Sequence, residues 1–223
     1  MKKMFKEIME ELRSVFSNKT FDTLLPPLVF VIVSAFYTLL MAGLVAISLA
    51  VLILIYRLVR RKTWAYAVSG LFVVMIASSF AYLAGNATNY FLPGIISSAV
   101  LLMIAIVSLV IKKPLAAWAS HLTRGWALPW FWRDDVKPAY QEVTLMWSVF
   151  IFIRLVIQVI LFIEQDAVQL FWVNTLLGLP LTIVVLILSY VYGIARLRRL
   201  KGPGIEEYLR GDTPPYKGQT RGF

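Results

Sequence analysis

The stretch VTLMWSVFIFIRLVIQVILFI, residues 143–163, decides the fold class, because it is long and apolar enough to cross a bilayer as one helix. It nevertheless carries Arg154 near its middle and Gln158 one helical turn later. An arginine at a helix centre costs about 2.5–3.5 kcal/mol, whereas each Leu, Ile, Phe or Val contributes roughly 0.3–0.6 kcal/mol. Residues 145–163 contain fourteen such side chains. The segment is therefore predicted to insert, with its arginine facing other helices rather than lipid.

The rest of the chain has the same apolar character. Of its 223 residues 60% are hydrophobic and only 15% are charged, which is typical of an integral membrane protein. The absence of cysteine excludes thiolate catalysis and cysteine metal sites, and a single histidine argues against a histidine metal site. No pattern of catalytic residues stands out, so we expect neither an enzyme nor a metal or other cofactor. We assign the net charge of +10 to loops facing anionic lipid, not to nucleic-acid binding.

The apolar blocks predict an all-α integral membrane protein, a six-transmembrane-helix bundle with short interfacial helices and both termini cytoplasmic. We place the spans at about 24–41, 43–59, 64–83, 91–111, 143–163 and 167–195. The first block, 24–56, has no charge and is flanked by basic residues on both sides, which favours a hairpin turning near residues 41–43 over one tilted helix. A partly re-entrant hairpin is the alternative. Of the 22 basic residues, all except Arg154 fall on the predicted cytoplasmic side.

Three segments lie outside these spans. Residues 1–20 read as an amphipathic helix, either lying in the membrane interface or binding a partner. In the cytoplasmic loop 112–141, one helical face is predicted to combine Leu115, Trp118, Leu122 and Trp126. That face is either a lipid-headgroup or gating element, or an anchor that fixes two helices. Residues 196–223 are rich in glycine, proline and charge and are predicted to be a basic disordered cytoplasmic tail.

Polar residues inside the spans are the candidate functional site. Trp147, Arg154 and Gln158 share one helical stripe, and Asn174 lies in the last span. No acidic residue is predicted at mid-depth, which argues against a proton or sodium relay. Arg154 either forms structural bonds, with Gln158 among its partners, or holds an anion or a lipid headgroup. Small residues recurring every four positions, Ala77, Ala81 and Gly85, predict close approach of another helix, in this chain or in a second copy.

Several motifs carry a family resemblance that runs in order across residues 21–195. They include FDTLLPPLVFVI at 21–32, AGNATNYFLPG at 84–94 and WRDDVKPAYQEVTLMWSVFIFIRLVIQ at 132–158. With these motifs, the chain resembles an uncharacterised family of bacterial six-span membrane proteins loosely associated with intracellular septation protein A. The resemblance implies a role in envelope integrity or division. The motif positions that it marks are Asp22, Pro26, Arg57, Asn89, Tyr90, Pro93, Trp132, Arg133, Tyr140 and Thr144.

These observations predict a non-enzymatic, multi-pass bacterial inner-membrane protein that acts in envelope organisation or septation, or in lipid interaction. Its expected partners are membrane lipids, with anionic headgroups on the cytoplasmic side, and either further copies of itself or other envelope proteins. The alternative is a small permease or channel for an anionic or amphipathic solute, with Arg154 and Gln158 lining the cavity.

Overall fold

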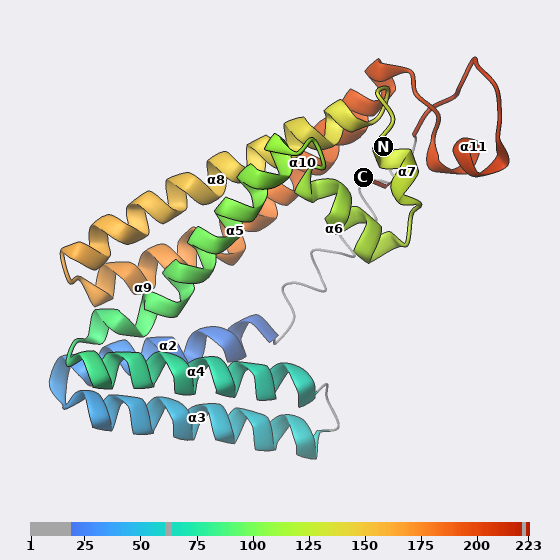
Figure 1. The fold of residues 1–223 in the computed structure, drawn as a ribbon. Coiled ribbons are helices and arrows are strands. Elements are labelled where there is room, and N and C mark those ends of the chain that lie inside the picture. The colour runs from blue at the N-terminus through green and yellow to red at the C-terminus, as the bar shows by residue number, and fades with distance from the viewer. Residues whose placement is uncertain (1–18, 61–63, 220–221) are drawn as a thin grey trace. The chain divides into compact units, whose positions relative to one another are not determined.

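The computed structural model describes residues 19–60, 64–219 and 222–223, and within these ranges the chain is helical and has no strand (Figure 1). Nearly all of the amphipathic helix predicted at 1–20 lies outside the described residues. The described helices are α2 (Lys19–Phe36), α3 (Leu39–Val59), α4 (Trp64–Ala84), η1 (Ala87–Phe91), α5 (Leu92–Val110), α6 (Leu115–Arg124), α7 (Leu128–Phe131), α8 (Lys137–Ile163), α9 (Ala167–Leu176), α10 (Leu179–Leu200) and α11 (Ile205–Arg210).

Four helical segments among the described residues are long and apolar enough to cross a membrane. They are Leu39–Val59, Ala87–Val110, Lys137–Ile163 and Ala167–Leu200. Two shorter apolar helices, Leu24–Phe36 and Val68–Ala84, correspond to the other two predicted spans. An all-helical, membrane-type architecture is therefore confirmed, and six crossings would require the two shorter helices to cross as well.

The break in the first apolar block lies earlier than the sequence predicts. The expected turn at residues 41–43 is wrong, because α3 begins at Leu39 and contains Met41 and Gly43. Thr38 explains the difference: its backbone is extended, and its hydroxyl accepts a hydrogen bond from the Met41 N–H at 3.4 Å. A threonine that accepts such a bond is a helix N-cap, and it starts a new helix directly after α2.

The predicted last span, 167–195, lies within one long apolar segment that has a break between two helices, α9 and α10. α9 ends at Leu176 and α10 begins at Leu179. Proline has no N–H, so Pro180 cannot bond to the carbonyl of Leu176 and continue the helical ladder. A Cβ added at Gly178 would overlap the carbonyl oxygen of Asn174, so the chain follows a path here that only glycine allows. α10 then runs on to Leu200, beyond the predicted end of the span at 195.

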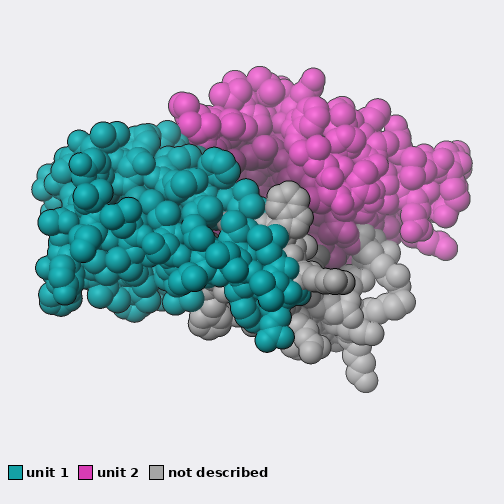
Figure 2. All heavy atoms as spheres, turned by 90° about the horizontal axis from the view of Figure 1, so that it is seen from below, with its two compact units in different colours: residues 1–97, 155–180 teal, residues 98–154, 181–223 magenta. Residues whose placement is uncertain are grey.

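The chain divides into two compact units, which Figure 2 shows in different colours. Unit 1 consists of residues Met1–Ser97 and Leu155–Pro180, and unit 2 of Ser98–Arg154 and Leu181–Phe223. Each unit has its own cluster of buried hydrophobic side chains.

In unit 1, α2, α3 and α4 run side by side (Figure 1). Small residues let α3 and α4 approach closely. Ala42, Ala46 and Ala50 recur every four residues on α3 and are buried, as are Ala77 and Ala81 on α4. The close contact predicted for the alanines of α4 is therefore made, at least in part, within the chain. Gly85 is not part of it, because this residue is exposed and ends α4 with a left-handed φ of 67°.

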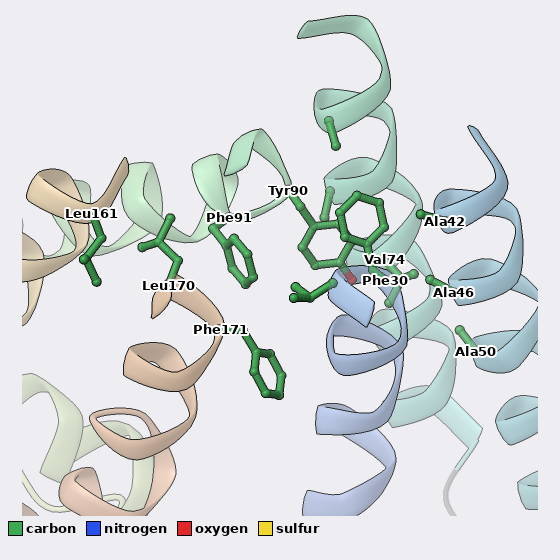
Figure 3. Packing of buried hydrophobic residues seen from close by; sticks show 13 residues of the cluster. Phe30, Ala42, Ala46, Ala50, Val74, Tyr90, Phe91, Leu161, Leu170 and Phe171 are labelled. Carbon is green, nitrogen blue, oxygen red and sulfur yellow. The ribbon is translucent and has the colours of Figure 1, made fainter. Parts of the chain in front are cut away.

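An aromatic pair fills the centre of unit 1. Figure 3 shows the rings of Phe30 and Tyr90 lying against each other. They are stacked, with their centroids 4.2 Å apart. Leu161 from α8 and Leu170 and Phe171 from α9 are buried in the same hydrophobic cluster. The η1 turn that carries Tyr90 is started by Asn86, whose side chain accepts a hydrogen bond from the Thr88 N–H at 2.8 Å.

In unit 2, two hydroxyl groups hold the start of α6. Pro114 precedes the helix and has no side-chain acceptor, so the first N–H groups of α6 need other partners. The Leu115 N–H donates to the Ser108 hydroxyl at 3.0 Å, and the Ala116 N–H donates to the Thr144 hydroxyl at 3.1 Å. Because Ser108 lies on α5 and Thr144 on α8, both helices fix the position of α6.

The segment after α10 is folded, contrary to the predicted disordered tail at 196–223. The Glu207 carboxylate accepts hydrogen bonds from the backbone N–H groups of Gly204, Lys217 and Gly218 at 2.8–3.0 Å. The Gln219 side chain accepts another from the Ile205 N–H at 2.9 Å. A composition poor in apolar residues predicts disorder because it cannot form a hydrophobic core. Here two polar side chains organise the backbone instead.

Candidate functional site

The residues between α5 and the first turn of α8 form an aromatic module, which we define as residues 115–140. Trp130, Phe131 and Tyr140 have no exposed surface. The Phe131 ring lies edge-on to both neighbours, with centroid distances of 5.0 Å to Trp130 and 4.9 Å to Tyr140. Trp126 packs against Trp130 at 5.5 Å. Edge-to-face packing of this kind stabilises each aromatic pair by about 0.5–1.5 kcal/mol beyond area burial, so the module is rigid.

One face of α6 is apolar and exposed. Leu122 is 80% exposed and Trp118 is 37% exposed, whereas Ala117 and Ser120 on the same helix are buried. The prediction of an apolar face through Trp118 and Leu122 is consistent with this exposure. Its extension to Trp126 is wrong, because Gly125 ends α6 in the left-handed conformation and Trp126 then packs into the module.

Basic residues stand at both ends of α6. Lys112 and Lys113 precede α6 and are exposed, and Arg124 is exposed at its last turn. The Arg124 guanidinium lies 5.2 Å from the centroid of the Trp126 ring, a cation–π contact. The single histidine, His121, hydrogen-bonds through Nδ1 to the Trp126 carbonyl oxygen at 2.6 Å, which supports the turn after α6.

Charged pairs fix the loop between α7 and α8. Arg133 donates two hydrogen bonds of 2.8 Å to the carboxylate of Asp135, and this contact raises the pKa of Arg133. Lys137 donates to Asp134 at 2.9 Å and lowers the pKa of that carboxyl group. Trp132 is half-buried, with its ring 5.9 Å from that of Trp118. The motif positions Trp132 and Arg133 therefore shape the exposed side of the module.

An ion pair that the sequence did not predict joins α8 to α10 in unit 2. Arg196 donates to both carboxylate oxygens of Glu142, at 2.8 and 2.9 Å, and the Tyr192 hydroxyl donates to Glu142 at 2.7 Å. A signal was present in the sequence, since Glu142 is an acidic residue at the start of a long apolar helix. Its basic partner, however, stands 54 residues later.

The predicted polar membrane residues are divided between the two units. In unit 1, the Gln158 side-chain N–H donates to the Asn174 side-chain oxygen at 2.6 Å, and the Asn174 side chain donates to the Leu170 carbonyl at 2.8 Å. In unit 2, the Trp147 indole N–H donates to the Ser189 hydroxyl at 3.2 Å, and Arg154 is half-buried. Gln158 is buried, and its side-chain oxygen has no hydrogen-bond partner among the described residues.

Most of the remaining motif positions lie in the packed interior. Arg57 is 2% exposed and Thr144 is 2% exposed. Thr144 has a defined role, because its hydroxyl donates to the Tyr140 carbonyl at 2.7 Å and accepts from the start of α6. Pro26 and Tyr90 are buried, Asn89 and Pro93 are half-buried, and the side chain of Asp22 is outside the described residues.

Within the described ranges, no group of three or more His, Asp or Glu side chains is arranged to hold a metal ion. Residues 18–199 match the model of a protein family whose description is "Protein of unknown function (DUF3159)". No curated protein and no solved structure matches the chain.

Proposed function

The chain belongs to this DUF3159 family of proteins of unknown function. We propose that it is a non-enzymatic membrane protein that contacts anionic lipid through its aromatic module. The observation that carries this proposal is the exposed apolar face of α6, with Leu122 80% and Trp118 37% exposed. Burying a leucine contributes about 1.5–3 kcal/mol. A rigid helix that presents such a side chain to water would lose that energy, whereas at a membrane surface the helix gains it.

The charge around α6 specifies the lipid. Lys112 and Lys113, before the start of α6, and Arg124, at its last turn, are exposed. Each basic residue near an anionic membrane surface contributes about 1 kcal/mol, and tryptophan side chains favour the headgroup region. This combination suits an interface that contains acidic phospholipid.

We assign the module to the cytoplasmic leaflet of a bacterial inner membrane. The distribution of basic residues supports six crossings with both termini cytoplasmic, the two shorter apolar helices completing the four long ones. A lipid-contacting module on a multi-pass protein suits a role in envelope organisation or septation. The alternative of a permease for an anionic solute has less support. The Gln158 side-chain oxygen, which has no hydrogen-bond partner among the described residues, is an acceptor and would repel an anion.

A single-cysteine label tests the lipid contact. Because the chain has no cysteine, Leu122→Cys provides one attachment point for an environment-sensitive fluorophore. In vesicles of phosphatidylglycerol and phosphatidylethanolamine, we expect a blue-shifted emission that brominated acyl chains quench. The matched control is Thr123→Cys, an exposed position that bonds back to the Ala119 carbonyl of its own helix, where we expect emission typical of water. A water-like emission at position 122 would contradict the proposal.

Two further comparisons test the charge dependence and the cellular role. Replacing Lys112 and Lys113 together with Gln should reduce the blue shift at position 122 in vesicles rich in phosphatidylglycerol, and should leave it unchanged in neutral vesicles. In cells that depend on this protein, Leu122→Asp should impair growth under osmotic stress and Thr123→Asp should not. Equal growth of the two variants would remove the link between lipid contact and the envelope.

A further inference from the structure

Residues 201–219 and 222–223, which we call the strap, lie against the aromatic module within unit 2. The Trp130 indole N–H donates to the Pro203 carbonyl oxygen at 2.9 Å, although 73 residues separate them. Ile205 is buried in the same cluster as Trp130, Phe131 and Tyr140. The Phe223 ring stacks on Tyr140, with centroids 4.3 Å apart and an angle of 10° between the planes.

The end of the strap fits a notch in α10. A Cβ added at Gly193 would overlap the Phe223 ring, so the ring rests directly on the helix backbone. The Gly222 N–H donates to the Tyr190 hydroxyl at 3.2 Å. Gly222 has a left-handed φ of 74°, and an added Cβ there would come within 2.8 Å of the Arg124 side chain. Gly193 and Gly222 are therefore both required for the Phe223 ring to pack against α10.

The strap is held together mainly by its own bonds. Glu207 accepts from three backbone N–H groups of the strap, and Gln219 bonds to Ile205 and Gly222. Between the described residues of the strap and the rest of unit 2, the contacts include the hydrogen bonds of Trp130 and Tyr190, the stacking of Phe223 on Tyr140 and the burial of Ile205. The Arg133 guanidinium also lies 5.9 Å from the centroid of the Tyr208 ring. The strap can therefore detach without losing the bonds that shape it.

We propose that the rings beneath the strap are a second, latent lipid-contact surface, which the strap covers in this structure. This inference rests on the proposed function. The covered rings are continuous with the exposed face of α6, since Trp118 contacts Trp132 and Trp132 packs against the Phe131 cluster. Aromatic rings with basic neighbours are the side chains that a headgroup region accepts, so a lipid surface is the occupant that fits once the strap moves away.

The test displaces the strap without touching the rings. Gly193→Ala places a methyl group where the Phe223 ring lies, and Gly70→Ala is the matched control, because a Cβ there meets no atom within 4 Å. In the full-length protein in vesicles, hydrogen exchange at the Gly222 amide should accelerate about tenfold in the first variant only. The Lys217 and Gly218 amides should stay protected, because Glu207 still holds them.

The lipid arm uses quenching of tryptophan fluorescence by brominated phosphatidylglycerol. Gly193→Ala should increase the quenched fraction, and adding Trp130→Phe should remove the increase. Phe223→Ala, which leaves every helix unchanged, should act in the same direction. If the exchange rate at the Gly222 amide stayed unchanged in both variants, the contact of Phe223 with Gly193 would not be what holds the end of the strap in place. Faster exchange at Gly222 without an increase in tryptophan quenching would contradict the latent lipid-contact surface, but not the lipid contact at Leu122. Emission typical of water from the fluorophore at position 122 would contradict the proposed function itself.

Discussion

The amide pair of the buried Gln158 and the half-buried Asn174 predicts that replacing one member costs more stability than replacing the other. The Gln158 side-chain N–H donates to Asn174 at 2.6 Å, but the Gln158 side-chain oxygen is buried without a described partner. Hydrogen bonds between membrane helices stabilise by about 0.6 kcal/mol on average, and up to about 1.7. A buried polar group without a partner costs about 1–3 kcal/mol. The unbonded oxygen therefore costs more than an average hydrogen bond of this kind contributes.

Gln158→Leu removes both the bond and the unbonded oxygen, and should leave the free energy of unfolding within about 1 kcal/mol of wild type. Asn174→Leu leaves the whole Gln158 amide buried without this partner, and should destabilise by about 1–3 kcal/mol. The double variant removes every polar atom of the pair and should recover the lost stability.

Thermal unfolding of the purified variants in detergent measures these differences. At about 2–4 °C per kcal/mol, Asn174→Leu should lower Tm by roughly 2–12 °C, and Gln158→Leu should change it by at most about 4 °C. Thr175→Leu is the control, because its hydroxyl bonds only locally in the described structure, to the Phe171 carbonyl, and its replacement should have little effect. Equal losses in the two single variants that add in the double variant would refute the reasoning.

Three further predictions concern glycines and the strap. The double variant Gly43→Cys, Ser78→Cys should form a disulfide on mild oxidation, detected as a shift in gel mobility. A Cβ at position 43 lies 3.3 Å from that of Ser78, close to the about 3.5–4.5 Å that a disulfide requires. The control pair Gly70→Cys, Ser78→Cys should not form one. Gly178→Ala should destabilise by about 1–3 kcal/mol in thermal unfolding, whereas Gly70→Ala should be neutral or stabilising. The N–H of Gly204 and two other backbone N–H groups lower the pKa of Glu207, so its contribution is present at neutral pH and is lost as pH falls through that lowered value. Protection of the strap amides, after correction for intrinsic exchange, should therefore fall in acid as the Glu207 carboxyl is protonated. Glu207→Gln, with its amides already less protected, should abolish that dependence.

The helical class of the fold follows from local sequence, whereas the helix boundaries do not. Apolar runs of about 20 residues identify membrane helices because a bilayer leaves the backbone few other choices. The start of α3 depends instead on whether the Thr38 hydroxyl bonds to the Met41 N–H, and hydropathy does not register such a bond. The break before α10 depends in the same way on the path of the backbone at Gly178.

The candidate site was predicted only in outline. Trp118 and Leu122 were identified on one face of a short helix, because periodicity along a helix is a local property. Their rigid presentation depends on hydroxyl groups of Ser108 and Thr144, which lie on other helices. The stripe through Arg154 and Gln158 was also predicted, but the bond that Gln158 makes is to Asn174, 16 residues later.

The sequence by itself determined that this protein is helical and of the membrane type, because hydrophobic length is a sum over neighbouring residues. Only the tertiary structure decided that the glycine-rich segment after α10 is a folded strap on the aromatic module. The bonds of Glu207 and the seat of Phe223 on Gly193 join residues that are distant along the chain. Such pairings depend on a three-dimensional fit that composition does not encode.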